Sequence, residues 1–263
     1  MPSLSESLQR HWPEYLMEAA GLGIFMISAA LCTTVLEYPG SPLHEMIPNV
    51  VVRRVLVGIA MGLTAVSLIY SPWGKRSGAH LNPAVTAAFF RLGKIERLDA
   101  LFYVVAQVLG GLAGLIIAAL AIGMAIADPT VNYVVTVPGP YGAAIAFVAE
   151  VVISFGLMFV VLLMSNMSSL NAWTGLFAGC LVAVYISLEA PLSGMSMNPA
   201  RTFASAVLAH CWTAFWVYLI APLFGMLFAA ECYVRLKGTH CVLCAKLHHD
   251  NSVRCIFRCG YMS

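Results

Sequence analysis

The stretch SGMSMNPART, from Ser193 to Thr202, decides the fold of this 263-residue chain. It lies between two long apolar stretches, yet it contains an Asn-Pro pair and, at Arg201, a full positive charge. A second copy, SGAHLNPAVT (Ser77–Thr86), agrees with the first at six of ten positions. Both copies open a short apolar segment, Asn82–Phe90 and Asn198–Leu208, and segments of about ten residues cannot cross a bilayer as a helix. We therefore predict two re-entrant segments, which are tolerated at membrane depth only where protein surrounds them or they line a water-filled cavity.

The composition excludes a soluble globular protein. Of all residues, 60% are hydrophobic and only 10% are charged, and the mean hydropathy is +0.86. An average soluble domain has about 25% charged residues, so this chain cannot cover a soluble surface and is predicted to span the lipid bilayer several times. The basic residues form no continuous stripe, so no nucleic-acid partner is expected. The first residues lack the pattern of a cleaved signal peptide, and none is expected.

Six apolar stretches reach the roughly 20 residues that a transmembrane helix needs. They are Tyr15–Val35, Val50–Tyr70, Ala100–Ala127, Ala143–Met164, Ala172–Leu188 and Trp212–Tyr233. All are rich in Gly and Ala, which let helix backbones approach closely in a membrane. The predicted fold class is an all-α membrane protein with six transmembrane helices and two re-entrant half-helices.

The chain is also an internal repeat. YVVAQVLG from Tyr103 aligns with YLIAPLFG from Tyr218. The number of residues that separates these two stretches is nearly the number that separates the two Asn-Pro-Ala stretches. Because each unit has three spans, the second unit must be inverted relative to the first, and such folds commonly place their site near the midplane. We predict an N-terminal segment (1–13), a channel domain (14–234, with repeats at about 14–127 and 140–234) and a Cys- and His-rich tail (235–263).

The basic residues predict the orientation. With both termini in the cytoplasm, 11 of the 14 Lys and Arg residues lie inside and only Arg53, Arg54 and Arg201 lie outside. The positive-inside rule therefore favours cytoplasmic termini.

The chemistry of Asn-Pro-Ala explains why it occurs twice. Pro83 and Pro199 suit the first position of a helix, and the preceding Asn82 and Asn198 are favoured N-caps. Each cap leaves amide N–H groups to donate, and each helix N terminus carries about half a positive charge. Two such helices meeting at mid-membrane would hold a polar neutral molecule weakly and repel a cation or a hydrated proton.

The doubled motif, NPAR and the paired membrane glutamates Glu18 and Glu150 resemble the aquaporin and aquaglyceroporin (major intrinsic protein) family from about Glu14 to Tyr233. The resemblance implies one pore per chain in a homotetramer, with no cofactor for transport. It also implies that the donors Asn82 and Asn198, with Pro83, Ala84, Pro199 and Ala200, lie at the pore centre. The pore-lining carbonyls that it implies are those of Gly78, Ala79, His80, Gly194, Met195 and Ser196.

Arg201 is expected to face a water-filled path, because a charge at the bilayer centre costs about 2.5–3.5 kcal/mol. The alternative is that it snorkels to the headgroups or makes a structural ion pair. The resemblance implies a selectivity filter in which this arginine lies with Met61, Ile186 and Met195. The alternative is that these three are ordinary packing residues. The strict water-channel pattern has an aromatic residue near 61 and a histidine near 186, and both are missing here.

The solute prediction therefore rests on mixed signals. Thr202, Ala206 and the pair Phe215-Trp216 resemble the water-channel subgroup, whereas the filter is expected to be wider and more apolar. Water is the predicted solute, and glycerol, ammonia, hydrogen peroxide and dissolved gases are the alternatives. A proton-coupled transporter remains a third hypothesis. No nucleophile–base pair is found, so no enzymatic activity is expected.

Glu18 and Glu150 need partners, because a buried carboxylate within a span is costly. One interpretation is a proton relay. The other is that each glutamate accepts hydrogen bonds from N–H groups of the irregular loop before a half-helix. The presence of one glutamate in each half of the repeat favours this second interpretation. His80 has two interpretations, a gate at the inner mouth or a side chain bonded within its loop.

Four cysteines cluster in the tail as C-x2-C-x10-C-x3-C: Cys241, Cys244, Cys255 and Cys259. In a reducing cytoplasm, thiols at this spacing, with His240, His248 and His249 nearby, predict a tetrahedral Zn²⁺ site outside the lipid. The alternatives are incidental cysteines in a disordered tail and membrane-proximal acylation. The resemblance lends the metal site no support.

Overall fold

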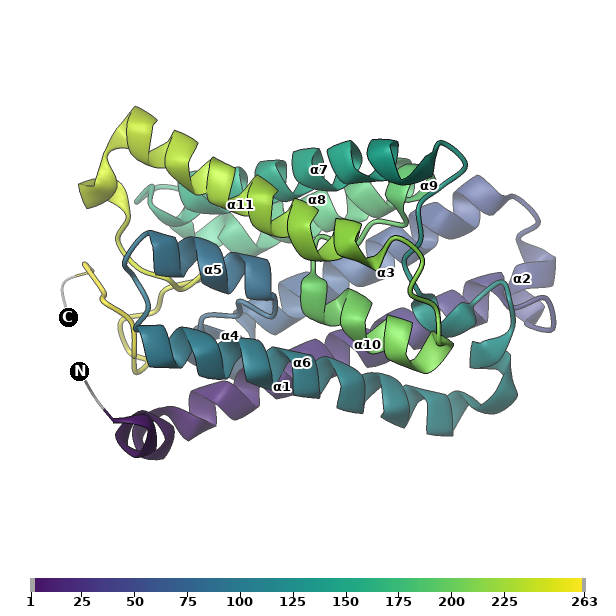
Figure 1. Ribbon diagram of the computed structural model, residues 1–263, viewed down its shortest axis with the longest axis horizontal. Helices are drawn as coiled ribbons and strands as arrows, with labels where there is room; N and C mark the ends of the chain where they lie inside the picture. The colour runs from purple at the N-terminus through teal and green to yellow at the C-terminus, as the bar shows by residue number, and fades with distance from the viewer. Residues whose placement is uncertain (1–2, 262–263) are drawn as a thin grey trace.

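The computed structural model describes residues 3–261, in which helices and loops occur and no strand is found (Figure 1). Among residues 3–261, six helices are long and apolar enough to cross a membrane. They are α1 (Leu4–Glu37), α3 (Val50–Tyr70), α6 (Arg97–Ile122), α7 (Gly142–Ser165), α8 (Thr174–Leu188) and α11 (Phe215–Lys237). Two half-helices, α5 (Pro83–Arg91) and α10 (Pro199–Ala209), begin at the prolines of the two motifs. The predicted fold class is confirmed.

Short helical turns join these elements. They are α2 (Pro42–Met46), α4 (Pro72–Ser77), α9 (Ala190–Ser193), η1 (Gly123–Ala127), η2 (Asn132–Val134), η3 (Asn171–Trp173) and η4 (Thr239–Cys241). The first span is longer than its apolar stretch, because Ser3 and Glu6 form a capping box that starts α1 at Leu4. The N-terminal segment expected at 1–13 therefore belongs to α1 from Leu4 onward; residues 1–2 and 262–263 lie outside the described residues.

Glycines set the distance between the packed helices. α1 packs on α6, α3 on α8 and α7 on α11. A Cβ atom at Gly110 would lie only 2.1 Å from the Ala19 carbonyl oxygen, and one at Gly62 would lie 2.6 Å from the Gly179 oxygen. These crossings are therefore closed by backbone-to-backbone contact, which a larger side chain would prevent.

The outside of the bundle is apolar and its interior holds carboxylates. Leu63, Leu109 and Phe224 are exposed on three different helices, whereas Glu18 and Glu150 are fully buried. This distribution is the one that a lipid solvent requires.

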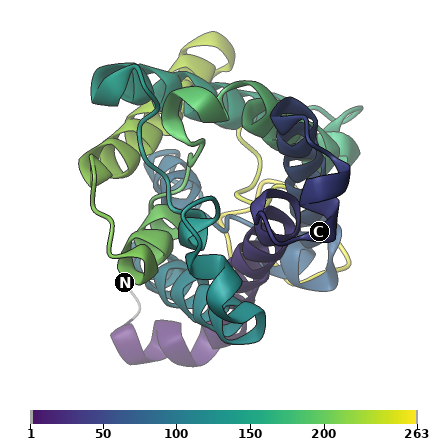
Figure 2. The same ribbon diagram turned by 90° about the vertical axis from the view of Figure 1, so that its right-hand side faces the viewer.

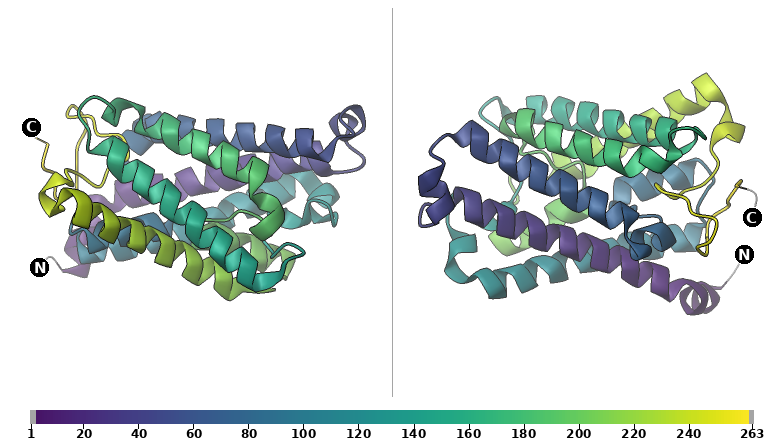
Figure 3. Two further views of the ribbon diagram at one scale, coloured as in Figure 1. Left: turned by 90° about the horizontal axis from the view of Figure 1, so that it is seen from above. Right: turned by 180° about the vertical axis from the view of Figure 1, so that it is seen from behind.

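The half-helices enter the bundle from opposite ends. α5 lies toward the end that holds both termini, which we call the terminal end, and α10 lies toward the far end (Figure 1). Seen along the bundle, the long helices form a ring, and the C-terminal tail (yellow) crosses behind its centre (Figure 2). Two further views place the tail at the terminal end (Figure 3). The tail thus folds back against the bundle rather than extending away from it.

Candidate functional site

The loop before α5 is held by Glu18 of α1. The Glu18 carboxylate accepts the Ser77 hydroxyl at 2.7 Å, the His80 N–H at 3.0 Å and the Leu81 N–H at 2.6 Å. The Gln107 amide of α6 donates to the same carboxylate at 2.8 Å. These donors stabilise the carboxylate in the interior, and they tie the loop to two long helices.

The loop before α10 repeats this arrangement around Glu150 of α7. The Ser193 hydroxyl and the Ser196 and Met197 N–H groups donate to the Glu150 carboxylate, each at 2.7 Å. Pro222 aligns with Gln107 in the repeat, and it has no side-chain donor. The bonding is therefore shared by both halves except for one amide.

The backbone geometry repeats as well. Ala79 and Leu81 have φ of +54° and +49°, and Met195 and Met197, each 116 residues later, have φ of +51° and +53°. Left-handed backbone is unfavourable for residues with a Cβ, so each loop stores strain that the surrounding bonds must offset. The two carboxylates supply those bonds, which explains why each half has one.

Asn82 and Asn198 cap the half-helices and also brace the opposite loop. The Asn82 side-chain oxygen accepts the Ala84 N–H at 2.8 Å, and the Asn198 oxygen accepts the Ala200 N–H at 3.1 Å. The Asn82 amide donates to the Met197 carbonyl and the Asn198 amide donates to the Leu81 carbonyl, both at 2.7 Å. Pro83 and Pro199 occupy the first helical position as predicted. The two N termini therefore face each other at the centre of the bundle.

A cavity of about 390 Å³ passes this meeting point. It extends from Glu37 and Arg54 at the far end, past Asn82 and Asn198, to Leu247 of the tail at the terminal end. All four residues expected at a filter line it: Met61, Ile186, Met195 and Arg201. So do five of the six residues expected to contribute carbonyls: Ala79, His80, Gly194, Met195 and Ser196.

Arg201 has a free donor at this cavity. Its Nη1 atom is buried and has no hydrogen-bond partner within the described residues. Its backbone N–H donates to the Asn198 cap at 3.3 Å, which fixes it in the first turn of α10. A guanidinium that lines a cavity with an unpaired N–H can donate to a passing acceptor.

The tail contacts two residues that the sequence analysis assigned to the pore, Gly78 and His80. Gly78 lies outside the cavity lining, and its carbonyl accepts the Leu247 N–H at 3.1 Å. His80 is bonded both within its loop and to the tail: Nδ1 lies 3.0 Å from Thr86 Oγ1, and Nε2 donates to the Ala245 carbonyl at 2.8 Å. The second bond could not be predicted from the sequence, because Ala245 is 165 residues away.

Two tyrosines were missed although the repeat contains them. The Tyr103 hydroxyl donates to the Ser77 carbonyl at 2.7 Å, and the Tyr218 hydroxyl donates to the Ser193 carbonyl at 2.6 Å. Both are fully buried, and both close the turn that precedes a pore loop. The alignment of YVVAQVLG with YLIAPLFG was the signal that could have found this role.

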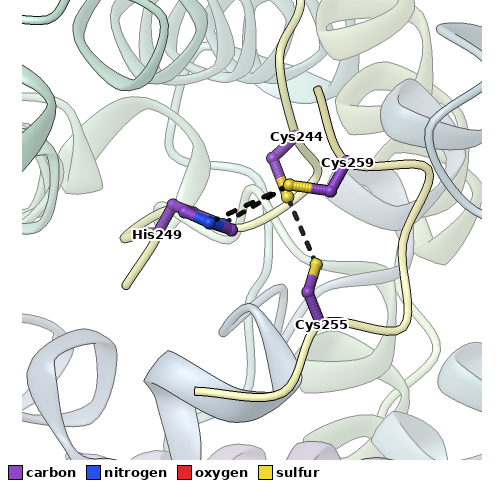
Figure 4. Close-up of side chains that lie close together, drawn as sticks. All are labelled: Cys244, His249, Cys255 and Cys259. Carbon is purple, nitrogen blue, oxygen red and sulfur yellow. Dashed lines mark hydrogen bonds between the residues drawn. The ribbon is translucent and has the colours of Figure 1, made fainter. Parts of the chain in front are cut away.

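The predicted metal ligands are gathered only in part. Cys244, Cys255 and Cys259 come together with His249, and their ligand atoms all lie within 4.8 Å of one another (Figure 4). Cys241, which the cysteine spacing predicts as a fourth ligand, does not belong to this cluster. The η4 turn keeps it beside the end of α11, where its thiol donates to the Lys237 carbonyl at 3.0 Å. His249 lies in the cluster instead.

A cavity inside a ring of six membrane helices, faced by two half-helix N termini, is the construction of a membrane channel. The family model described as "Major intrinsic protein" matches residues 6–233, and the chain belongs to this family. The resemblance inferred from the doubled motif is thereby confirmed.

Individual relatives agree with this assignment. Aquaporin NIP6-1 of Arabidopsis thaliana is 38% identical over 184 residues, which cover 69% of this chain and 58% of that protein. A probable aquaporin NIP-type of Nicotiana alata is 34% identical over 186 residues, 69% of this chain and 65% of that protein. The chain thus matches less than two thirds of the length of these relatives.

One solved structure shows the same fold. The X-ray structure of the aquaglyceroporin from Plasmodium falciparum superposes with a TM-score of 0.72 and covers 85% of this chain and 95% of that chain. Its sequence identity is 22%, so the likeness concerns the fold alone.

Proposed function

We propose that the chain is a passive channel that conducts water down an osmotic gradient and excludes protons and ions. The observation that carries the proposal is the meeting of two Asn-capped half-helices on one cavity of about 390 Å³. The positive ends of both helices point at the same place, and the field there repels cations. Water is neutral and has acceptor lone pairs, so it is held weakly and passes on.

In this proposal Asn82 and Asn198 are the central donors. A primary amide has two N–H groups, and each asparagine uses one to brace the opposite loop. The remaining N–H of each side chain is left for a solute oxygen. Conduction itself requires no cofactor, and the chemistry of the tail is separate from it.

Arg201, Met61, Ile186 and Met195 form the selectivity filter of the proposed pore. The Nη1 group of Arg201 would replace part of the hydration that a solute loses on entry. The other three side chains have no strong hydrogen-bond donor or acceptor, so they admit apolar parts of a solute. Glu18 and Glu150 have the role of holding the pore loops.

The second candidate function is facilitation of other small neutral solutes, such as glycerol, ammonia, hydrogen peroxide or dissolved gases. The apolar filter favours it, because a filter without a histidine ring offers fewer fixed polar partners and more width. Methionine is flexible, so Met61 and Met195 can adapt to guests of different size.

We further propose that both termini are cytoplasmic and that four chains assemble, each with its own pore. Both termini lie at one end of the bundle, where 11 of the 14 Lys and Arg residues are expected (Figure 1). The positive-inside rule then assigns that end to the cytoplasm.

The test is stopped-flow light scattering on proteoliposomes under an osmotic step, with chelator and reductant present so that the tail thiols carry no metal or disulfide. Water permeability well above that of empty liposomes is expected, without dependence on a proton gradient. Permeability equal to that of empty liposomes would overturn the proposal, and flux driven by a proton gradient would support a coupled transporter instead.

A matched pair of variants tests the filter. Ile186 lines the cavity, whereas Val184, on the same helix, does not and is exposed. Ile186→Ala should raise glycerol permeability and Val184→Ala should leave it unchanged. Equal behaviour of the two variants would exclude Ile186 from the filter.

A further inference from the structure

We propose that Cys244, His249, Cys255 and Cys259 bind a Zn²⁺ ion, and that the metal-bound tail is a plug that closes the terminal mouth of the pore. The metal site stands on its own geometry. The closing of the pore rests on the proposed channel function.

The four side chains have the spacing of a tetrahedral site. The Cys244 and Cys255 sulfur atoms are 3.6 Å apart, and the Cys259 sulfur lies 3.8 Å from His249 Nδ1 (Figure 4). A tetrahedron with Zn–S bonds of about 2.3 Å has sulfur atoms about 3.8 Å apart. Three thiolates and one imidazole are also ligands that select zinc over magnesium or calcium. Binding would release three thiol protons and involves no redox step.

The histidine is oriented as a ligand by its neighbours. Its Nε2 atom lies 2.5 Å from Asn251 Oδ1, which leaves Nδ1 for the metal. Its ring stacks on Tyr261 with 4.3 Å between centroids, and the Tyr261 hydroxyl donates to the Ser165 carbonyl at 2.6 Å. The ring is thus fixed to the terminal end of α7.

A buried lysine matches the charge of the proposed site. Zn²⁺ with three thiolates carries a net charge of −1. Lys246 is almost fully buried, and its ammonium donates to the Arg254 carbonyl at 2.8 Å, next to Cys255. None of the ion pairs found among residues 3–261 joins Lys246 to a carboxylate. A buried ammonium needs a counter-charge, and the metal–thiolate centre supplies one.

The tail closes the cavity at the terminal end. Leu247 lines the cavity there, and its N–H donates to the Gly78 carbonyl. The Ala245 carbonyl accepts from His80, and the Phe257 ring stacks on the His80 ring with 5.4 Å between centroids. The tail therefore sits on the loop whose carbonyls and histidine would otherwise face the mouth.

Ion pairs also join the tail to the terminal end of the bundle. Arg258 pairs with Glu96 at 2.7 Å, and Lys75 pairs with Asp250 at 3.6 Å. These groups are exposed or partly exposed, so each pair contributes little. Beyond the η4 turn the tail has no helix or strand of its own up to residue 261. Ala245, Leu247 and Phe257 are buried against the bundle, and a bound metal would add a link between parts of the tail that no helix or strand joins.

Metal content of the purified full-length protein tests the site. We expect one zinc per chain by mass spectrometry, and Co²⁺ in its place should give the visible spectrum of a tetrahedral thiolate site. Cys255→Ser should lower metal affinity about a hundredfold or more, because one of four ligands is lost. Cys241→Ser is the matched control and should retain the metal. Equal metal content in all three proteins, or a metal-free wild type with a Cys244–Cys255 disulfide, would overturn the site.

Release of the tail is measured independently of conduction, by trypsin cleavage at Arg254 and Arg258. With zinc the cleavage should be slow, and with chelator it should be many times faster. Equal cleavage rates would overturn the plug whether or not the protein conducts. The chelator experiment uses the wild-type chain, so a folding defect of Cys255→Ser cannot imitate the result.

Flux measurements complete the test. Zinc-loaded wild type should conduct water several times more slowly than chelated wild type, and Cys255→Ser should conduct like the chelated protein under both conditions. If both forms of the wild type conduct water and the zinc-loaded form has the same water permeability as the chelated form, the plug is overturned. Zinc-dependent cleavage with no flux in any form would support the metal-held tail and reject the channel function.

Discussion

The contact between α1 and α6 gives a prediction that links packing to the pore. Replacing Gly110 by alanine would put a Cβ atom 2.1 Å from the Ala19 carbonyl oxygen and 2.4 Å from its Cα atom. The adjacent Gly111 is a matched control on the same helix. A Cβ atom there would lie 3.3 Å from the flexible Leu22 side chain and 3.6 Å from the Ala200 carbonyl oxygen, which is an ordinary contact distance. Both changes gain the same helix propensity, about 1 kcal/mol, so it cancels in the comparison.

The expected magnitude follows from the distance. Ordinary contact begins at 3.4 Å, so the helices must separate by 3.4 − 2.1 = 1.3 Å to admit the Gly110→Ala methyl group. Overpacking of this kind costs about 1–3 kcal/mol. We expect Gly110→Ala to be about 2–3 kcal/mol less stable than Gly111→Ala, which corresponds to a Tm lower by about 4–12 °C.

The same shift should reach the pore loop. Ala19 follows Glu18 directly, and the Glu18 carboxylate holds the Leu81 N–H at 2.6 Å. Moving α1 away from α6 weakens that bond and loosens the loop, so water permeability should fall in Gly110→Ala but not in Gly111→Ala. The assays are thermal unfolding in detergent and stopped-flow shrinkage of proteoliposomes. Equal Tm values for the two variants would refute the reasoning.

Three further predictions concern single side chains. Arg201→Val should keep water permeability but admit protons, measured with a pH-sensitive dye inside liposomes; an unchanged proton barrier would assign exclusion to the helix N termini alone. Asn198→Ala removes an N-cap and the bond to the Leu81 carbonyl, so the free energy of unfolding, measured in a denaturation series, should fall by about 2–3 kcal/mol. A decrease in this free energy below about 0.5 kcal/mol would contradict the bracing role. Burial raises the pKa of Glu189, just beyond α8, from 4.5 to about 7. The folded chain then binds more protons than the unfolded chain between these values, so Tm should fall as pH rises from 4.5 to 7 and Glu189→Gln should lack that slope; a wild-type Tm that rises over this range would contradict it.

The half-helices were predictable because their signals are local. An N-cap and a proline at the first helical position act within one turn, so Asn82-Pro83 and Asn198-Pro199 mark a helix start whatever surrounds them. The spans follow from the length of apolar runs, and Val50–Tyr70 was predicted with the bounds that α3 has. The first span was predicted too short, because the capping box of Ser3 and Glu6 extends the helix through polar residues.

The Cys and His cluster of the tail shows where local signals fail. The spacing of the four tail cysteines predicts that Cys241 belongs to the cluster, but which side chains come together depends on how the chain between them folds. The end of α11 keeps Cys241 apart, and the stacking of His249 on Tyr261 brings in a residue that the cysteine pattern did not contain.

The sequence by itself determined the class of this protein: six spans, two facing half-helices and a carboxylate for each pore loop, since apolar length, capping and the doubled motif are properties of short segments. Only the tertiary structure decided that each asparagine braces the opposite loop, that a tyrosine closes each turn and that the tail packs against the loop before α5. Those contacts join residues that are far apart in the sequence, such as His80 and Ala245, which are 165 positions apart, and no local preference encodes them. They exist because a closed helix bundle brings the ends of distant segments to one place, where buried donors must find acceptors.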